Sequence, residues 1–93
     1  MSKPFMISYD LNAPGQNYEK VKDVITNFGG AYIKLQKSFW LVRNDLTADE
    51  MTRDILNVVD KNDSIFVCEL NNDYQGNTTQ ENWDFIRENI FSE

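Results

Sequence analysis

Asp10 is the residue whose type and position best suit chemistry in this chain. It ends the largely apolar run 4–9 and precedes a polar loop that contains Pro14 and Gly15. A carboxylate at the end of a strand lies at the rim of a sheet, where it can accept hydrogen bonds or bind a hard cation. The chain has no histidine and one cysteine, which excludes Ser-His-Asp and Cys-His arrangements and the usual zinc ligand sets. Carboxylate chemistry is what remains.

Two interpretations of Asp10 stay open from spacing alone. In the first, the carboxylate accepts hydrogen bonds from amides of the following turn, as in an Asx motif. In the second, it binds a metal ion. One Asp per chain supplies too few oxygens, but two copies of Asp10 across the dyad of a homodimer would hold Mg²⁺ or Mn²⁺ together with its retained waters. Such a metal would stabilise the charge that develops on a phosphodiester and help to generate the attacking hydroxide.

Hydrophobic spacing predicts the elements that position Asp10. Residues 5–10 alternate in the manner of a half-buried strand. Its two faces hold Phe5, Ile7 and Tyr9 on one side and Met6, Ser8 and Asp10 on the other. Residues 11–16 form a loop, and apolar residues spaced by three and four predict a helix over residues 17–28. Gly29 and Gly30 end that helix, because glycine accepts the left-handed cap conformation.

The second half of the core begins with a hairpin of two strands, and a helix and a last strand follow it. Residues 31–36 and 38–43 are predicted strands, and Thr47 with Glu50 forms a capping box that opens the next helix. The inner side of this helix holds Met51, Ile55, Leu56 and Val59. The last core strand covers residues 64–70, in which Cys68 is expected to be a buried small hydrophobic residue.

The predicted order of strand, helix, strand, strand, helix, strand is that of an α+β, ferredoxin-like βαββαβ fold. Residues 1–70 form this core, with a four-stranded antiparallel sheet and both helices on one face. Residues 71–93 add a polar loop and a short acidic helix, opened by a capping box of Thr78 and Glu81. Its apolar stripe consists of Trp83, Ile86 and Ile90. The stripe packs either on its own sheet or on a dimer partner.

Composition limits the partners. The 93 residues suit one small domain, and a hydrophobic content of 41% supports a packed interior. The formal net charge of −6 argues against strong non-specific binding to a nucleic acid, although a local patch or a bound cation could still hold one. The single cysteine allows no intramolecular disulfide. With no signal peptide and no apolar stretch of about 20 residues, we expect a cytoplasmic protein without a membrane partner.

Three short motifs resemble one protein family. They are Ser8-Tyr9-Asp10-Leu11, then Ser38-Phe39 within residues 36–42, then Asp63-Ser64 before the apolar run 65–67. In this order they look like the CRISPR-associated Cas-two superfamily. The loop Pro14-Gly15-Gln16 makes the chain most similar to the SinR-like branch of small relatives. The resemblance covers about residues 5–70.

The resemblance implies a ferredoxin-like homodimer whose two sheets face each other. It also implies metal-dependent cleavage of RNA or DNA, or a non-catalytic scaffolding role on DNA. Asp10 carries over as the catalytic residue and metal ligand. Tyr9 and Ser38 are weaker candidates for the site, as neighbours that shape the dyad.

A second hypothesis differs in class. Relatives that bind nucleic acid often carry Arg and Lys after the aspartate, whereas this chain has the uncharged segment 11–16. The acidic charge and the aromatic tail around Trp83 and Phe85 favour a non-catalytic dimeric interaction module of phage or mobile-element type. Its partner would be another protein.

Overall fold

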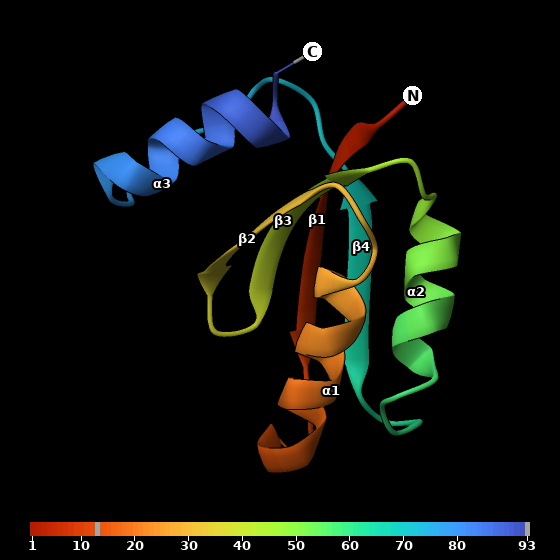
Figure 1. Cartoon of the computed structure of the whole chain (residues 1–93). Coiled ribbons are helices and arrows are strands. Elements are labelled where there is room, and N and C mark those ends of the chain that lie inside the picture. The colour runs from red at the N-terminus through yellow and green to blue at the C-terminus, as the bar shows by residue number, and fades with distance from the viewer. Residues whose placement is uncertain (13, 93) are drawn as a thin grey trace.

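The computed structural model describes residues 1–12 and 14–92, and for residues 14–16 it describes the backbone alone. Ala13, which falls in the predicted loop, and Glu93 lie outside the described residues. The elements are β1 (Lys3–Asp10), α1 (Pro14–Thr26), β2 (Ala31–Gln36), β3 (Phe39–Asn44), α2 (Ala48–Leu56), β4 (Ser64–Glu69), α3 (Gln80–Phe85) and the π-helix η1 (Ile86–Ile90). The first six have the predicted βαββαβ order (Figure 1).

The four strands form one antiparallel sheet in the order β2-β3-β1-β4. β1 is therefore a central strand, with Ile7 opposite both Trp40 of β3 and Val67 of β4. Both α1 and α2 pack on the same face of the sheet (Figure 1). The predicted ferredoxin-like α+β fold is confirmed, and a helical segment follows it.

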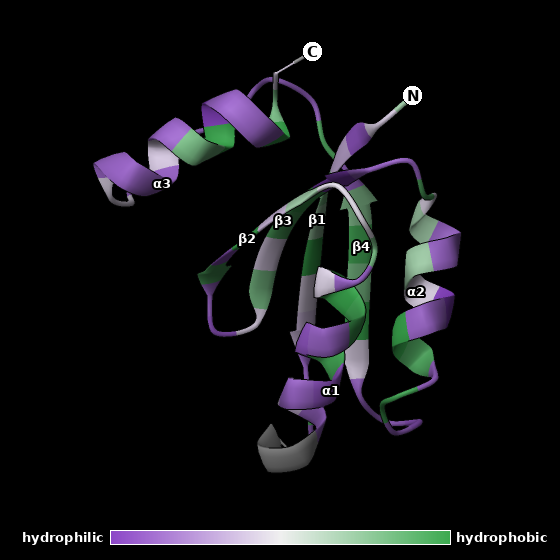
Figure 2. Cartoon of the chain, in the orientation of Figure 1, coloured by the Kyte–Doolittle hydropathy of each residue, from purple (hydrophilic) through white to green (hydrophobic). Residues whose placement is uncertain are grey.

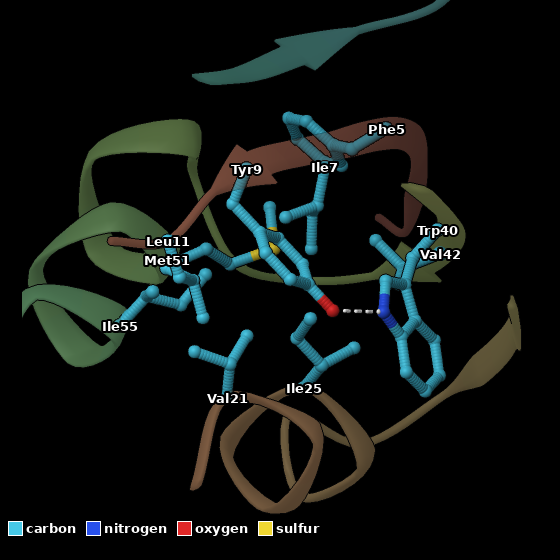
Figure 3. Close-up of a cluster of buried hydrophobic side chains, with 10 residues drawn as sticks. All are labelled: Phe5, Ile7, Tyr9, Leu11, Val21, Ile25, Trp40, Val42, Met51 and Ile55. Atoms are coloured by element: carbon cyan, nitrogen blue, oxygen red, sulfur yellow. Dashed lines mark hydrogen bonds between the residues drawn. The ribbon is translucent and has the colours of Figure 1, made fainter. Parts of the chain in front are cut away.

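The main core lies between the sheet and these two helices. Strand residues alternate between the two faces, and helix residues return to one face every three or four positions, so both supply regular apolar rows. The buried members are Phe5, Ile7, Tyr9, Leu11, Val21, Ile25, Trp40, Val42, Met51 and Ile55 (Figure 3). The strands are mostly hydrophobic in colour, whereas the loops that join the elements are mostly hydrophilic (Figure 2).

The bounds of α1 lie earlier in the chain than the predicted range 17–28. Pro14 occupies the first helical position, where its missing amide costs no hydrogen bond and its fixed φ suits the helix. After α1 ends, Gly29 and Gly30 take positive φ angles of 88° and 74°. The predicted end of the helix before these glycines is therefore confirmed. Residues 14–16 of the predicted loop belong to α1.

The predicted capping box opens α2. The Glu50 amide donates to Thr47 Oγ1 at 3.1 Å, and the Glu50 carboxylate accepts from the Thr47 amide at 2.9 Å. Met51 and Ile55 are buried as predicted. The predicted inner position of Leu56 is wrong, since this side chain is 53% exposed. One residue rotates a helix by about 100°, which carries Leu56 away from the face of Ile55.

The cap of α3 lies one residue later than predicted. Thr79 is the N-cap, and its Oγ1 accepts the Asn82 amide at 3.1 Å. The predicted capping box of Thr78 and Glu81 is therefore wrong. Thr78 Oγ1 instead accepts a hydrogen bond from Asn82 Nδ2 at 2.8 Å. Two adjacent threonines offer the same side-chain oxygen, so spacing alone does not choose between them.

The C-terminal segment packs against the sheet face that lies away from α1 and α2, which we call the second face. α3 contacts β2, and η1 contacts both β2 and β3. Ile86 and Ile90 of the predicted stripe are buried, as are Leu41 and Phe91, and Trp83 is half-buried. Within this chain the stripe lies on its own sheet.

Arg43 joins both ends of the chain to β3. Its Nη1 donates to the carbonyl of Ile90 at 2.8 Å, which satisfies a helix-end acceptor. Its Nε and Nη2 donate to the Ser2 hydroxyl and carbonyl at 3.0 and 3.2 Å. One guanidinium therefore ties the N-terminus and η1 to the same strand.

Gly30→Ala should destabilise the protein more than Gly29→Ala. Both positions have positive φ, which costs an L-residue about 1–2 kcal/mol. A Cβ at Gly30 would also collide with the Arg43 carbonyl oxygen, whereas a Cβ at Gly29 has nothing within 4 Å. In urea unfolding we expect a loss of about 1 kcal/mol for Gly29→Ala and about 3 kcal/mol or more for Gly30→Ala. Equal losses would contradict the close approach of Gly30 to β3.

Candidate active site at the end of β1

Asp10 is the last residue of β1, and it is exposed. It lies opposite Ser64 of β4. Because strand side chains alternate, Asp10 shares the second face with Met6 and Ser8. Its carboxylate therefore lies at the end of a central strand, where solvent or a second molecule can contact it.

The second face is open around the pairing of β1 with β4. Phe66 lies opposite Ser8 and is 64% exposed, and Cys68 lies opposite Met6 and is also exposed. We call Ser8, Asp10, Phe66 and Cys68 the open patch. An aromatic side chain this exposed beside a strand-end carboxylate is suited to contact another molecule.

The prediction that Cys68 is buried is wrong. Ile65 and Val67 pack against the main core, whereas Phe66 and Cys68 face the other way. Four apolar residues in a row are typical of a strand that is buried on both faces. Here one face of β4 is open, because the C-terminal segment packs over β2 and β3 instead.

The turn amide that would complete an Asx motif with Asp10 is used elsewhere. The Asn12 amide donates to Asp63 Oδ1 at 2.8 Å, and Asn12 Nδ2 donates to the Asn62 carbonyl at 2.8 Å. Asp63 Oδ2 also accepts the Asp60 amide at 2.9 Å. These amides favour the charged carboxylate and hold the pKa of Asp63 below its ordinary value. Asp63 thus joins the loops after β1 and before β4.

Tyr9 lies on the opposite face from Asp10 and is only 5% exposed. Its hydroxyl accepts a hydrogen bond from Trp40 Nε1 at 2.8 Å, inside the main core (Figure 3). Burial raises the pKa of this hydroxyl, which the bond from Trp40 lowers to a smaller extent. Tyr9 therefore positions the end of β1 from within the core and is not brought to Asp10.

Ser38 lies in the turn between β2 and β3, beside the end of β1. Its carbonyl accepts the Tyr9 amide at 3.1 Å, so the turn and the strand end are held together through the backbone. The ammonium of Lys37 in the same turn lies 5.6 Å from the ring centroid of Tyr18 on α1. The Lys37 ammonium therefore lies on the side of the sheet that α1 and α2 cover, away from the face of Asp10.

A single copy offers Asp10 as a lone carboxylate. Within residues 1–12 and 14–92, no three acidic or cysteine side chains gather into a group that could hold a metal ion. Mg²⁺ prefers octahedral oxygen ligands and is often bound through one or two carboxylates plus waters. Two copies of Asp10 could supply that number, so the donor set fits a hard cation only in a symmetric pair.

No family model matches the chain, and no curated protein matches it. Among the helices described here, none is long and apolar enough to cross a membrane.

Tyr9→Phe should destabilise the fold, because it leaves the buried Trp40 Nε1 without its acceptor. We expect a loss of about 1–3 kcal/mol in urea unfolding at pH 7. Tyr32→Phe is the matched control, since its ring also lies near Trp40 but is 42% exposed, and its cost should stay below about 0.5 kcal/mol. Equal costs would contradict the buried bond.

The raised pKa of Tyr9 extends this prediction to alkaline pH. The unfolded chain releases the Tyr9 proton first, near pH 10, so the stability contributed by the neutral hydroxyl is lost as pH rises above that value. Tyr9→Phe should therefore show a smaller fall in stability between pH 9 and pH 11 than the wild type.

Asp63→Asn should weaken the fold at neutral pH and reduce its sensitivity to acid. The folded pKa of Asp63 is lowered, so its contribution is present above the unfolded pKa, near 4, and is lost as pH falls through the folded value. Thermal unfolding should give a lower Tm than wild type at pH 7, with the two curves converging toward pH 3. Asp54→Asn, on the exposed side of α2, should keep the wild-type Tm at pH 7.

Proposed function

We propose that this chain is a homodimeric, Cas-two-like protein in which two open patches face each other. The two Asp10 carboxylates then bind one Mg²⁺ or Mn²⁺ at the dyad and support cleavage of a phosphodiester in RNA or DNA. The observation that carries this proposal is the place of Asp10: exposed at the end of a central strand, on the uncovered part of the second face.

The open patch supports contact with a second copy. Phe66 and Cys68 present apolar surface to solvent, and burial of such surface favours association. Asp10 lies on the same face, so closing the patch around a two-fold axis would bring the two carboxylates toward each other. Their mutual repulsion would be relieved by a divalent cation between them.

The chain's own residues would hold the site in place. Asp63 fixes the loop that follows β1 through the Asn12 amide, and Ser38 fixes the β2–β3 turn beside it through the Tyr9 amide. A bound divalent metal would supply charge stabilisation at the phosphate and an activated water. Asp10 would orient that metal from a strand whose opposite side is anchored by the bond between Tyr9 and Trp40.

A second candidate is a non-catalytic acidic interaction module that uses the same dimer. The net charge of −6 per chain favours it, because a polyphosphate would be repelled except where a cation intervenes. In this case Phe66 and its neighbours would contact a protein partner, and Asp10 would serve only as a solvated rim residue.

Asp10→Asn tests the metal site while preserving the shape of the side chain. Wild type should cleave single-stranded RNA or DNA in the presence of Mn²⁺ or Mg²⁺, and the variant should lose at least about 100-fold of this activity, as expected when a metal ligand is removed. Activity should vanish in EDTA.

Asp54→Asn is the matched control, because Asp54 is an exposed carboxylate on the opposite side of the molecule. It should cleave like wild type, and all three proteins should show the same Tm. Light scattering should give a dimer for each. Equal cleavage by wild type and Asp10→Asn after stringent purification would reject catalysis and leave the interaction module, whereas a monomer at tens of micromolar would reject both candidates.

A further inference from the structure

A pocket of about 290 Å³ lies between the C-terminal segment and the sheet. Its floor is formed by apolar side chains of the second face, among them Phe39 and Leu41. Its walls come from the loop before α3 and from α3 itself, with Tyr74 and Trp83 as the aromatic members. Its volume lies just below the range for small-molecule sites, which starts at about 300 Å³.

The aromatic wall is held in place before any ligand arrives. The ring of Tyr74 is stacked on Phe91, with centroids 4.0 Å apart and planes inclined by 9°. Trp83 lies against the same tyrosine at 6.2 Å and 29°. A Cβ at Gly76 would lie 4.0 Å from Trp83 Cη2, so the absence of a side chain there keeps the space beside the indole free. A preformed apolar surface binds without a large ordering cost.

The lining also includes uncharged polar residues. These include Gln36, Gln75 and Asn77, which are exposed and whose side chains end in amides. Aspartate, glutamate, lysine and arginine are absent from the described residues that line the pocket. Each amide carries both donors and an acceptor, and can pair with the edge of a ligand that has the same two kinds of group.

We propose that this pocket binds a nucleobase. A planar heteroaromatic ring matches the aromatic wall, and its alternating donors and acceptors match the amides. A charged ligand would find no opposite charge in the lining, and an aliphatic chain would leave the amides unmatched. The base comes either from a free nucleoside or from an unstacked position of a single strand. This inference does not involve Asp10 and stands apart from the proposed metal site.

Titration by NMR tests the pocket in the full chain, in EDTA, so that metal binding plays no part. The probes are adenosine, guanosine, cytidine and uridine, followed by short single-stranded oligonucleotides. The Trp83 indole N–H signal should shift in a saturable way. The Trp40 indole signal should stay in place, because Trp40 donates to Tyr9 in the main core on the other face. Shifts with oligonucleotides alone would identify a strand as the source, and shifts with nucleosides as well would identify the base itself.

Gly76→Leu should fill the space beside Trp83 and weaken binding by about tenfold or more. Asn71→Leu also places a leucine in this loop, at an exposed residue outside the lining, and should bind like wild type. Gln75→Leu removes one amide and should also weaken binding. Asp10→Asn should bind normally, which separates this inference from the metal site. No shift of Trp83 with any probe, or equal binding by Gly76→Leu, would overturn the proposal.

Discussion

The alternation of side chains along β1 is the constraint on which the rest of the molecule depends. Within β1, the odd-numbered residues from Phe5 to Tyr9 fill the main core, and the even-numbered residues from Met6 to Asp10 face away from it. Burying Tyr9 against Trp40 therefore turns Asp10 onto the second face. A slip of one residue would bury the carboxylate and expose the phenol. The hydrogen bond in the core and the position of the acidic group outside it are two consequences of one register.

The C-terminal segment covers one part of the second face and leaves the other part open. α3 and η1 contact β2 and β3, and Arg43 fastens η1 to β3 through the Ile90 carbonyl. This arrangement produces two different surfaces on one sheet. Over β2 and β3 the C-terminal segment encloses the aromatic pocket, and beside β4 it leaves Phe66 exposed.

Much of the fold can be predicted from local sequence patterns. The alternation in residues 5–10, the two glycines after α1 and the pair of Thr47 with Glu50 each depend on neighbours in sequence. The errors arise where distant contacts decide. Cys68 belongs to an apolar run, yet it is exposed because the tail covers other strands. Asp10 could be singled out from its position, but the use of the Asn12 amide by Asp63 depends on a loop some 50 residues away.

The charge of the chain bears on how a nucleic acid could be recognised at all. A protein of net charge −6 gains little from counterion release, the usual source of affinity for phosphates. Recognition of an uncharged base by stacking and amide hydrogen bonds needs no lysine or arginine. A divalent cation at Asp10 would likewise bring positive charge that the side chains lack. Phe39, in the floor of the pocket, pairs with Ser8, which is two residues from Asp10 on the same face. The two proposed sites thus lie on neighbouring strands of the same face, and neither needs a lysine or arginine side chain.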